Sequence, residues 1–480
     1  MFNGMKLSQI ADPLNAEFNG SDVGFDSVSI DGRTLQPKQL YIALRGENFD
    51  GHAFVKQAYE AGAAALIVSE SVAARVPAEL PQLKVKDTKI ALGQLARLNR
   101  ELSQTRLVAV TGSSGKTTVK EMVFSILSEM GNCLATKGNF NNEIGVPLTL
   151  LRLEQADDFG VIELGASACG EIDYLVSLVE PEVAIITNVA RAHLSGFGRL
   201  SDVASAKGEI LGGIRAGGTA VLNADDEFYI KWRLKALSEG CKVLAFSTDR
   251  SKITTHADLT CVDVNASRPD QSNFVLVTPT EKTDITLALA GQHNIANALA
   301  AAAAAIAMGA TIAQIKTGLE KMQPVQGRMV PYQAIQNSTV IDDSYNANPG
   351  SVKAAIRTLA SYSGRRILVL GDMGELGEQS ESLHREMGLL AAQNKIDAVF
   401  TLGEKSAATY AEYVGLHLGG GGAFDQREQL LSSLLPRLNE KTVVLVKGSR
   451  SAHMEKVVEE LRINNAPTDQ ESADFELEVN

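Results

Sequence analysis

Short apolar runs alternate along this chain with longer segments in which apolar residues recur at helical spacing. In the middle of the chain the apolar runs are residues 107–110, 159–163, 183–187 and 219–223. Such alternation predicts a mostly parallel sheet with helices between its strands. The chemistry of a sheet of this kind lies in the loops that follow the C-terminal ends of its strands.

The same alternation continues towards both ends of the chain. Near the N-terminus it predicts strands at 39–44 and 64–69 and helices at 52–61 and 90–103. Towards the C-terminus it predicts strands at 339–343, 366–370, 398–402 and 442–446. An alanine-rich stretch, 296–308, predicts a closely packed helix that stops at Gly309.

Two interruptions divide this pattern into three parts. The N-terminal elements end near residue 104, and a segment bounded by prolines, 324–331, follows the alanine-rich helix. We therefore expect an α/β protein of three domains, at residues 1–104, 105–327 and 328–480. The tail from residue 464 is acidic and polar, and we expect it to fray.

The composition is that of an ordinary globular protein. Of the 480 residues 45% are hydrophobic and 21% charged, and the net charge is −12 (45 basic minus 57 acidic residues). This charge argues against a general nucleic-acid binder or a protein of anionic membranes, so local positive sites must bind any anionic ligand. Nothing in the sequence demands more than a monomer.

The cysteines and the N-terminus bear on the compartment. Cys133, Cys169, Cys241 and Cys261 are far apart and form no C-x-x-C pair, which indicates neither a zinc site nor a disulfide framework. The first residues lack the apolar core of a signal peptide, and no apolar run approaches the length of about 18 residues that a membrane span needs. We expect a cytoplasmic protein without membrane insertion.

A glycine-rich turn between a strand and a helix carries the strongest chemical signal. Residues 109–118 read A-V-T-G-S-S-G-K-T-T and are followed by helical spacing over 119–130. Backbone N–H groups at such a turn bind phosphate, a lysine adds charge and a hydroxyl binds Mg²⁺. The predicted nucleotide-binding residues are Thr111, Gly112, Ser113, Ser114, Gly115, Lys116, Thr117 and Thr118. The turn departs from G-x-x-x-x-G-K-[ST] because Val110 stands at the first glycine position.

Further polar side chains follow neighbouring strands of the predicted sheet. Glu163 ends one strand, where a parallel neighbour of the phosphate loop would carry a magnesium-binding carboxylate, and His193 follows another. Lys207 lies on a predicted helix capped by Ser201. Taken singly, such residues are more often a solvated carboxylate, a structural histidine and an exposed helical lysine. A loop at 138–145 adds side-chain amides, among them Asn141 and Asn142, that could bind phosphate or the water ligands of magnesium.

Together these motifs resemble one family. The ordered set comprises T-G-S-S-G-K-T-T, G-N-F-N-N-E-I-G, E-L-G at 163–165, N-V-A-R-A-H-L at 188–194, A-K-G-E-I at 206–210, G-Q-H-N-I-A-N at 291–297 and G-R at 327–328. The set is similar to that of the ATP-dependent Mur ligases. The resemblance implies that ATP phosphorylates a carboxyl group and that an amine attacks the resulting acyl phosphate. It also implies an N-terminal uridine-nucleotide-binding domain, a central P-loop ATPase domain and a C-terminal Rossmann-like domain.

The resemblance implies roles for single residues. Lys116, His193 and Lys207 would be catalytic, Thr117 and Glu163 would serve magnesium, and His193 would lie near a second ion. Lys207 would be carbamylated by CO₂ and so become a carboxylate-like group that positions magnesium. Asn294 and Asn297 would border the adenine, while Arg328 would contact phosphate and Asp343 the ribose.

The outer domains carry the substrate motifs. Residues 29–54 resemble the family's uridine-nucleotide-binding segment, although the usual D-S-R reads Asp31-Gly32-Arg33 here. The implied substrate-binding residues are Arg33, Gly46, Asp50, Gly51, His52, Asn141, Asn142, Tyr345 and Asn348. D-D-S-Y-N-A-N-P, L-G-D-M-G-E-L-G and K-G-S-R in the third domain imply the member that adds D-alanyl-D-alanine to UDP-MurNAc-tripeptide. Without the resemblance, the first segment is equally well a turn between two strands.

Three alternatives stay open at this point. The chain could be another ligase of the same type, such as the one that forms the tripeptide or a folylpolyglutamate synthase relative. It could be a regulatory P-loop NTPase, although the first glycine of the usual phosphate-loop pattern is missing. It could be an inactive binding relative, which the presence of Lys116, Glu163, His193 and Lys207 argues against.

Overall fold

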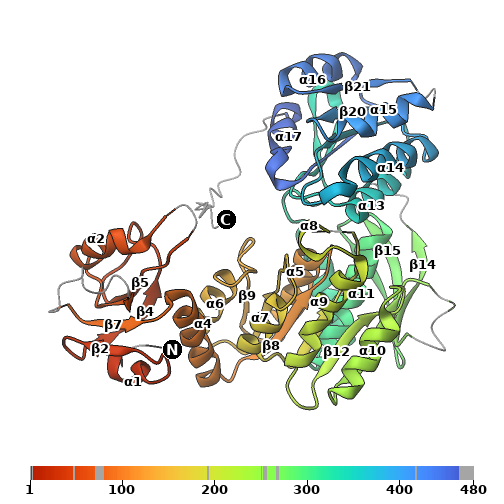
Figure 1. Cartoon of the computed structure of the whole chain (residues 1–480). Coiled ribbons are helices and arrows are strands. Elements are labelled where there is room, and N and C mark those ends of the chain that lie inside the picture. The colour runs from red at the N-terminus through yellow and green to blue at the C-terminus, as the bar shows by residue number, and fades with distance from the viewer. Residues whose placement is uncertain are drawn as a thin grey trace.

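The structure is a computed structural model of the chain. It describes residues 2, 4–46, 49–70, 80–191, 194–249, 251, 257–265, 270–416 and 419–463. The chain forms three mixed α/β domains, each built on its own sheet (Figure 1). Among the described residues, no helix has both the length and the apolar character to cross a membrane.

The N-terminal domain contains a five-stranded sheet in the order β2-β7-β6-β5-β4. Its strands are β2 (Glu17–Asn19), β4 (Ser27–Ser29), β5 (Gln39–Ile42), β6 (Ala65–Ser69) and β7 (Gln82–Val85). Its helices are α1 (Leu7–Ala11), α2 (Val55–Glu60) and α4 (Thr88–Leu102), and β1 (Met5–Lys6) pairs with β3 (Gly24–Phe25). A 3-10 turn, Gly51–Phe54, precedes α2, so the helix predicted over 52–61 begins later.

The central domain contains a nine-stranded sheet in the order β16-β15-β14-β13-β12-β11-β8-β10-β9. Its parallel strands are β8 (Arg106–Thr111), β9 (Cys133–Ala135), β10 (Phe159–Glu163), β11 (Val183–Ile186), β12 (Thr219–Asn223), β13 (Lys242–Ser247) and β14 (Leu259–Asn265). The strands β15 (Ser272–Val277) and β16 (Lys282–Leu287) continue the sheet in antiparallel order. This antiparallel edge is a feature that the sequence pattern did not predict.

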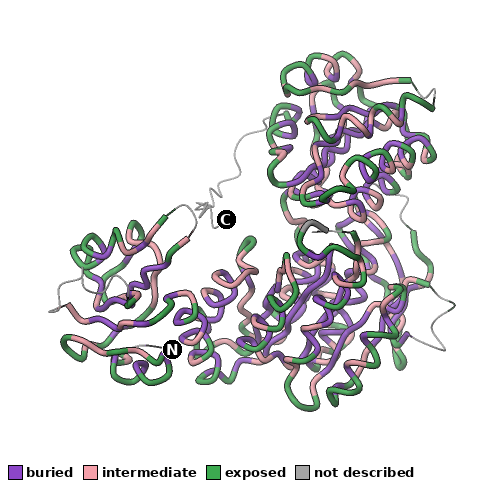
Figure 2. Tube along the Cα trace, viewed as in Figure 1, coloured by how far each residue is buried: buried purple, intermediate pink, exposed green. Residues whose placement is uncertain are grey.

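Helices cover both faces of the central sheet. They are α5 (Lys116–Leu127), α6 (Gly145–Leu150), α7 (Glu171–Val179), α8 (Leu194–Phe197), α9 (Leu200–Lys207), α10 (Tyr229–Ser238), α11 (Gln292–Ala307) and α12 (Ile312–Lys321). One hydrophobic core lies under α5, α11 and α12, and a second lies under α6, α7 and α10. The strands between them are buried along their length (Figure 2).

The C-terminal domain contains a six-stranded sheet in the order β17-β18-β22-β19-β20-β21. Its strands are β17 (Val330–Gln333), β18 (Thr339–Asp343), β19 (Arg365–Gly371), β20 (Ala398–Leu402), β21 (Gly421–Phe424) and β22 (Thr442–Lys447). Its helices are α13 (Pro349–Ala360), α14 (Ser380–Gln393), α15 (Ala407–Gly415), α16 (Arg427–Leu434) and α17 (Glu455–Leu461). All strands except β17 run parallel, so the loops after β18, β19, β20 and β22 lie at one edge.

Helix α4 connects the first two domains. Its residues Leu92 and Leu95 belong to the core of the N-terminal domain, while Ala96 belongs to the core of the central domain. Asn99 donates a hydrogen bond from Nδ2 to the carbonyl oxygen of Leu150 at 2.8 Å, which ties α4 to α6. One face of a single helix therefore packs into both domains.

The strand predictions agree closely with the structure, whereas two further helix predictions, besides that for 52–61, are wrong in detail. The runs at 159–163, 219–223, 339–343 and 398–402 form β10, β12, β18 and β20 with the predicted bounds. The helix predicted from residue 119 begins at Lys116, because the glycine turn itself starts the helix. Ser201 does not cap α9, which begins at Leu200 after Arg199.

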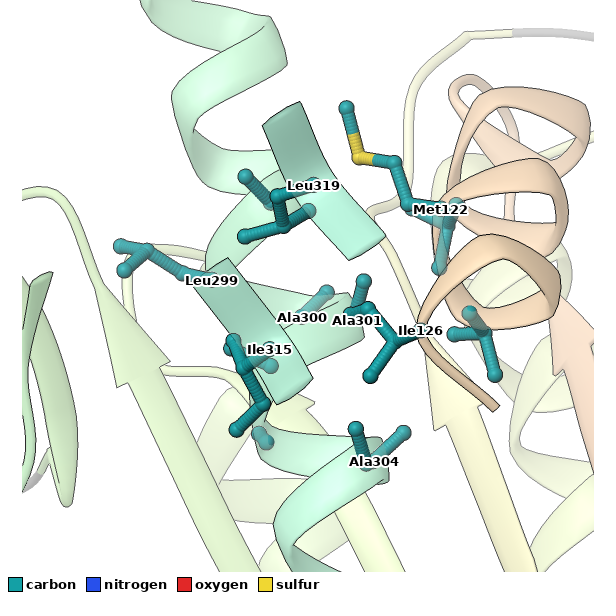
Figure 3. Close-up of a cluster of buried hydrophobic side chains, with 14 of the residues drawn as sticks. Met122, Ile126, Leu299, Ala300, Ala301, Ala304, Ile315 and Leu319 are labelled. Carbon is teal, nitrogen blue, oxygen red and sulfur yellow. The ribbon is translucent and has the colours of Figure 1, made fainter. Parts of the chain in front are cut away.

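Close packing of α12 against α5 depends on Gly318. Figure 3 shows Met122 and Ile126 of α5 facing Ile315 and Leu319 of α12, with Leu299, Ala300, Ala301 and Ala304 of α11 beside them. A Cβ atom on Gly318 would lie 2.5 Å from the Cα of Ile126. Ser125 donates a hydrogen bond to the carbonyl oxygen of Gly318 at 2.6 Å, so the two helices are already held together there.

We expect Gly318→Ala to lower the stability of the central domain by about 1–3 kcal/mol, because the added methyl group pushes α12 from α5. Trp232, the only tryptophan, is buried in this domain, so its fluorescence during urea unfolding reports the change. Gly212→Ala is the control, because a Cβ atom on Gly212 meets no atom within 4 Å. Equal midpoints for the two variants would contradict the packing argument.

Candidate functional site

Two glycines give the loop between β8 and α5 its shape. Gly112 has φ +146°, and a Cβ atom there would lie 2.0 Å from Thr187 Oγ1. Gly115 has φ +81°, and a Cβ atom there would lie 2.5 Å from Asn297 Oδ1. Only glycine fits these positions, so the loop brings backbone N–H groups to the N-terminus of α5.

The end of the neighbouring strand β11 holds this loop in place. Thr187 Oγ1 donates to the carbonyl oxygen of Ser114 at 2.6 Å. The side-chain amide of Asn188 donates to the same oxygen at 3.1 Å, and its Oδ1 accepts from the Ser114 N–H at 3.1 Å. Ser113 N–H donates to the Asn188 carbonyl at 3.0 Å. Thr187 and Asn188 therefore set the loop conformation, a role that the motif alone did not assign to them.

Lys116 lies in the first turn of α5 and bends back over the loop. Its ammonium group donates to the carbonyl oxygen of Gly112 at 2.9 Å. Burial lowers the pKa of Lys116, and the nearby Arg328 adds to this shift while Glu163 opposes it. The lysine charge is thus held at the mouth of a backbone cradle, where a phosphate oxygen would neutralise it.

Thr117, in the first turn of α5, meets Glu163 at the end of β10. Thr117 Oγ1 lies 2.9 Å from Glu163 Oε2, and Asn141 donates from Nδ2 to Glu163 Oε1 at 2.9 Å. Both Thr117 and Glu163 are buried. A carboxylate and a hydroxyl so placed offer oxygen ligands of the kind that Mg²⁺ takes together with substrate phosphates and water.

In the loop at 138–145, the side chains of Asn141 and Asn142 have different roles. Asn141 points its amide at Glu163, as described above, whereas Asn142 accepts the N–H of Gly145 at 2.9 Å and of Ile144 at 3.2 Å. Asn142 therefore shapes the start of α6. Thr136, after the three-residue strand β9, accepts the Glu163 N–H at 3.0 Å and so fixes the backbone beneath the carboxylate.

Lys207 is the last residue of α9 and is almost completely buried, at 1% exposure. Its ammonium group lies 3.3 Å from the carbonyl oxygen of Ala166 and 5.6 Å from the ring centre of Phe197. Burial, together with the charge of Lys116, lowers the pKa of Lys207 to about 7. The sequence alone favoured an exposed lysine here, and the structure contradicts that reading.

Arg328 brings the C-terminal domain to the phosphate loop. It donates from Nη2 to Thr117 Oγ1 at 2.9 Å, and its guanidinium lies 4.3 Å from the ring centre of Tyr345. The Nε atom of Arg328 is buried and has no hydrogen-bond partner among the described residues. A buried donor without a partner is costly, so a bound anion would stabilise this guanidinium.

Asn348 adds a second contact between the same two domains. It caps α13 by accepting the N–H of Ser351 at 2.9 Å, and it donates from Nδ2 to the carbonyl oxygen of Ser113 at 3.2 Å. The structure therefore brings Arg328, Tyr345 and Asn348 together with the phosphate loop, as a site between two domains requires.

Asp343, Asn294 and Asn297 lie at the same junction and are buried. Asp343 pairs with Lys447 of the K-G-S-R motif at 2.7 Å, and Lys447 also donates to the carbonyl oxygen of Asn346 at 2.8 Å. Asn297 donates to Asn294 Oδ1 at 3.1 Å. A Cβ atom on Gly115 would collide with Asn297, so the N-terminal part of α11 lies directly beside the phosphate loop.

The residues predicted to bind a uridine nucleotide form a separate group in the N-terminal domain, at left in Figure 1. Asp50 accepts from His52 Nδ1 at 2.6 Å and pairs with Arg45 at 3.0 Å. Burial alone would raise the pKa of Asp50, but the hydrogen bonds from His52 and Arg45 outweigh it and lower this pKa to about 2. Arg33 is largely exposed and pairs with Asp31 at 2.8 Å.

Two glycines shape the same group. A Cβ atom on Gly51 would lie 2.8 Å from the Leu44 carbonyl oxygen, and Gly46 N–H donates to the Phe49 carbonyl at 2.9 Å. These residues form one turn, which the structure does not bring to the phosphate loop.

His193 falls outside the described residues, so its predicted place in the site stays a prediction. In the part of the chain that is described, no group of three or more histidine, cysteine, aspartate or glutamate side chains could hold a metal ion. A magnesium ion here would depend on Glu163, a hydroxyl and the oxygens of its substrate.

The sequence analysis did not predict Thr136, Thr187 and Lys447 as site residues. Their roles depend on contacts between elements that are far apart in the sequence.

Models of known domain families match the chain in all three domains. The Mur ligase family catalytic domain matches residues 25–100, the Mur ligase middle domain 110–305, and the Mur ligase glutamate ligase domain 327–450. The chain belongs to the Mur ligase family.

Relatives and solved structures narrow the comparison within the Mur ligases. The UDP-N-acetylmuramoyl-tripeptide–D-alanyl-D-alanine ligase of Escherichia coli is 47% identical over 461 residues, covering 95% of this chain and 98% of that protein. The crystal structure of MurF from Acinetobacter baumannii is 34% identical, with a TM-score of 0.87 over 95% of this chain and 99% of that one. MurF from Thermotoga maritima, solved in complex with ADP, is 25% identical, with a TM-score of 0.79 over 90% and 96% of the two chains.

The pKa of Lys207 is lower in the folded protein than in the unfolded chain, so the unfolded chain binds more protons at neutral pH. Lys207 therefore lowers the free energy of unfolding at this pH. We expect Lys207→Met to raise the unfolding free energy of the central domain by a few kcal/mol at pH 7. The gain should fall to about half at pH 9, since the unfolded lysine then binds fewer protons. Urea unfolding followed by Trp232 fluorescence in CO₂-depleted buffer measures both values.

Lys120→Met is the matched control. Lys120 is also buried, but it donates to the Thr136 carbonyl at 2.7 Å and contacts the Glu121 carboxylate, so its loss should destabilise the domain. An equal gain for Lys207→Met at both pH values would show that lysine desolvation is not the cause.

Proposed function

We propose that this Mur ligase joins D-alanyl-D-alanine to UDP-N-acetylmuramoyl-tripeptide, with ATP converted to ADP and phosphate. The observation that carries the proposal is the junction at Thr117, where the phosphate loop, the Glu163 carboxylate and Arg328 of the C-terminal domain meet within hydrogen-bond distance. The 47% identity to the ligase of that name over nearly the whole chain supports this substrate pair.

The residues present fit ATP and Mg²⁺. The backbone cradle at Gly112 and Gly115 and the Lys116 ammonium provide donors for phosphate oxygens, and so does the Nε of Arg328, which has no partner in the described part of the chain. The two asparagines Asn294 and Asn297 lie beside the loop, where the adenine would be. Thr117 and Glu163 would hold Mg²⁺, which when bound neutralises phosphate charge and so lets a carboxylate approach.

The first step activates a carboxyl group. An oxygen of the terminal carboxylate of the tripeptide attacks the γ-phosphorus of ATP, the bond from phosphorus to the ADP oxygen breaks, and an acyl phosphate forms. Both reactants are anions, so the step requires positive charge at the place where they meet. Lys116 and Arg328 supply this charge from two domains, and Thr117 holds the guanidinium in position.

The second step forms the amide bond. The free amine of D-alanyl-D-alanine attacks the acyl carbon through a tetrahedral intermediate, phosphate leaves with the bonding electron pair, and the amine proton passes to the surrounding base or solvent. Closure of the C-terminal domain keeps water away from the acyl phosphate during this step. The contacts of Asn348 with Ser113 and of Arg328 with Thr117 hold the two domains together.

We assign Lys207 the role of a carbamylated residue. Carbamylation requires an uncharged amine, and burial leaves a large part of Lys207 uncharged near neutral pH. The carbamate would carry a negative charge among the positive charges of Lys116 and magnesium. The side chain would then position magnesium, as a carboxylate does. His193, on the segment before α8, completes the proposed set of catalytic residues.

The two organic substrates would bind to residues of all three domains. Arg33, together with Gly46, Asp50, Gly51 and His52 of the later turn, would bind the uridine nucleotide. Asn141, Asn142, Tyr345 and Asn348 would contact the peptide ends near the phosphate loop. We place the reaction in the cytoplasm, where ATP is present and where the four free cysteines stay reduced, and we expect the chain to act as a monomer.

A phosphate-release assay tests the proposal directly. UDP-MurNAc-tripeptide is combined with D-alanyl-D-alanine or with single amino acids, and each mixture is measured with ATP and Mg²⁺. We expect phosphate release only when donor and dipeptide are both present. The Lys116→Ala variant should lose turnover by at least about 10³-fold while it keeps the Trp232 fluorescence of the native protein, because it removes charge from the transition state and not packing.

Each other outcome points to a different protein. Use of a single amino acid in place of the dipeptide would assign the chain to another ligase of the family. Full nucleotide hydrolysis without donor or acceptor would indicate a regulatory NTPase. Turnover of Lys116→Ala at the wild-type rate would contradict the role of the phosphate loop.

A second variant tests carbamylation. We expect Lys207→Ala to lose most of its activity, because magnesium loses a negatively charged neighbour, and to recover part of it in formate or acetate, which fit the vacated space. The same salts should not activate Lys116→Ala, which lacks a positive charge. Full activity of Lys207→Ala without added carboxylate would remove this assignment.

A further inference from the structure

His384 is a fully buried histidine of α14 that the proposed chemistry does not use. Its exposed fraction is 0%, and it lies in the C-terminal domain, at the side of the sheet that α14 and α15 cover. Both ring nitrogens have partners: Nε2 lies 3.0 Å from the N–H of Met373, and Nδ1 lies 2.7 Å from the carbonyl oxygen of Ser380. A buried histidine that satisfies two backbone groups holds them at a fixed separation.

The two contacts define the state of the ring. Because the Met373 N–H can only donate, Nε2 must accept, and Nδ1 must therefore carry the proton that is donated to Ser380. Burial lowers the pKa of His384; the hydrogen bond to Ser380 and the nearby Asp372 oppose this shift, and Lys405 adds to it. The ring thus stays neutral and keeps its acceptor for Met373 at neutral pH.

Met373 belongs to the loop of residues 372–377, which follows β19 and connects three strand ends. Asp372 accepts the Ser406 N–H on its side chain at 2.7 Å and the Ser449 N–H on its carbonyl oxygen at 2.9 Å. These serines follow β20 and β22, so one loop sets the arrangement at the edge of the sheet where a parallel α/β domain binds its ligand.

The same loop reaches the central domain. Met373 and Leu376 share a buried apolar cluster with Phe197 and Val203 of α8 and α9, and the 3-10 helix Gly377–Gln379 contacts α8. Phe197 lies over the Lys207 ammonium. Figure 1 shows α8 at the boundary below the C-terminal domain. The loop therefore packs on the helix pair that carries Lys207.

We infer that His384 is a positioning residue for acceptor binding: by holding the Met373 N–H it fixes the 372–377 loop both at the strand ends and against α8. This inference rests on the proposed function for the identity of the acceptor. His384 touches neither substrate nor reacting atoms, and it acts only through the loop. The ligand whose binding depends on it is the D-alanyl-D-alanine dipeptide, with its ammonium and carboxylate groups.

Two substitutions of His384 distinguish the contributions of its two ring nitrogens. His384→Asn keeps a donor near the position of Nδ1 but is too short to accept from Met373, whereas His384→Gln places an oxygen near the position of Nε2. We expect His384→Asn to raise the KM for D-alanyl-D-alanine by about five- to tenfold, the loss that one buried hydrogen bond produces. The KM for ATP should change less than about twofold, and His384→Gln should restore most of the acceptor KM.

Thr409→Val is the matched control. Thr409 donates from Oγ1 to the backbone carbonyl of His384 at 2.9 Å, so its loss weakens the contact between α14 and α15 and leaves the ring and the loop untouched. This variant should melt at a lower temperature with an unchanged acceptor KM. If His384→Asn and Thr409→Val have the same KM for D-alanyl-D-alanine, His384 has only a structural role.

Hydrogen exchange gives a readout that does not depend on catalysis. In the whole protein without substrates, peptides that cover 371–377 and 194–206 should exchange faster in His384→Asn than in the wild type, and at the wild-type rate in Thr409→Val. Unchanged exchange in 371–377 would overturn the inference. If the wild type ignores D-alanyl-D-alanine, the proposed function fails, while the exchange experiment still decides whether His384 holds the loop.

Discussion

The hydroxyl of Thr117 is the point on which the arrangement of this protein depends. It lies between the Glu163 carboxylate of the central sheet and the Arg328 guanidinium, which arrives from the C-terminal domain. A carboxylate, a cation and a hydroxyl can be buried side by side only if they satisfy one another's hydrogen-bonding groups. The phosphate loop, the edge of the central sheet and the C-terminal domain are all positioned by this requirement.

Around this point the protein keeps charges in positions that cost stability. Lys207 is buried with a lowered pKa, and the Arg328 Nε atom is buried without a partner among the described residues. Ligands would relieve both costs, because a phosphate satisfies a guanidinium and a carbamate removes the lysine charge. Substrates that bind where the two domains meet would therefore stabilise the contact between them.

Part of this site follows from the sequence, and part does not. Apolar runs predicted the strands, and Glu163 was expected at a strand end because a parallel sheet gathers such ends at one edge. Thr136 was missed because it follows a three-residue edge strand, Cys133–Ala135, that is too short for a pattern. The burial of Lys207 could not be predicted, because it depends on Phe197 and on the apolar cluster shared with the C-terminal domain.

The central claim is that the junction at Thr117 activates a carboxyl group by phosphorylation. A donor tripeptide whose terminal carboxylate carries ¹⁸O tests it most directly. If an acyl phosphate forms, one ¹⁸O atom passes from the carboxylate to the phosphate released with each new amide bond, as mass spectrometry of the phosphate will show. Phosphate that contains no ¹⁸O while the amide accumulates would contradict the account.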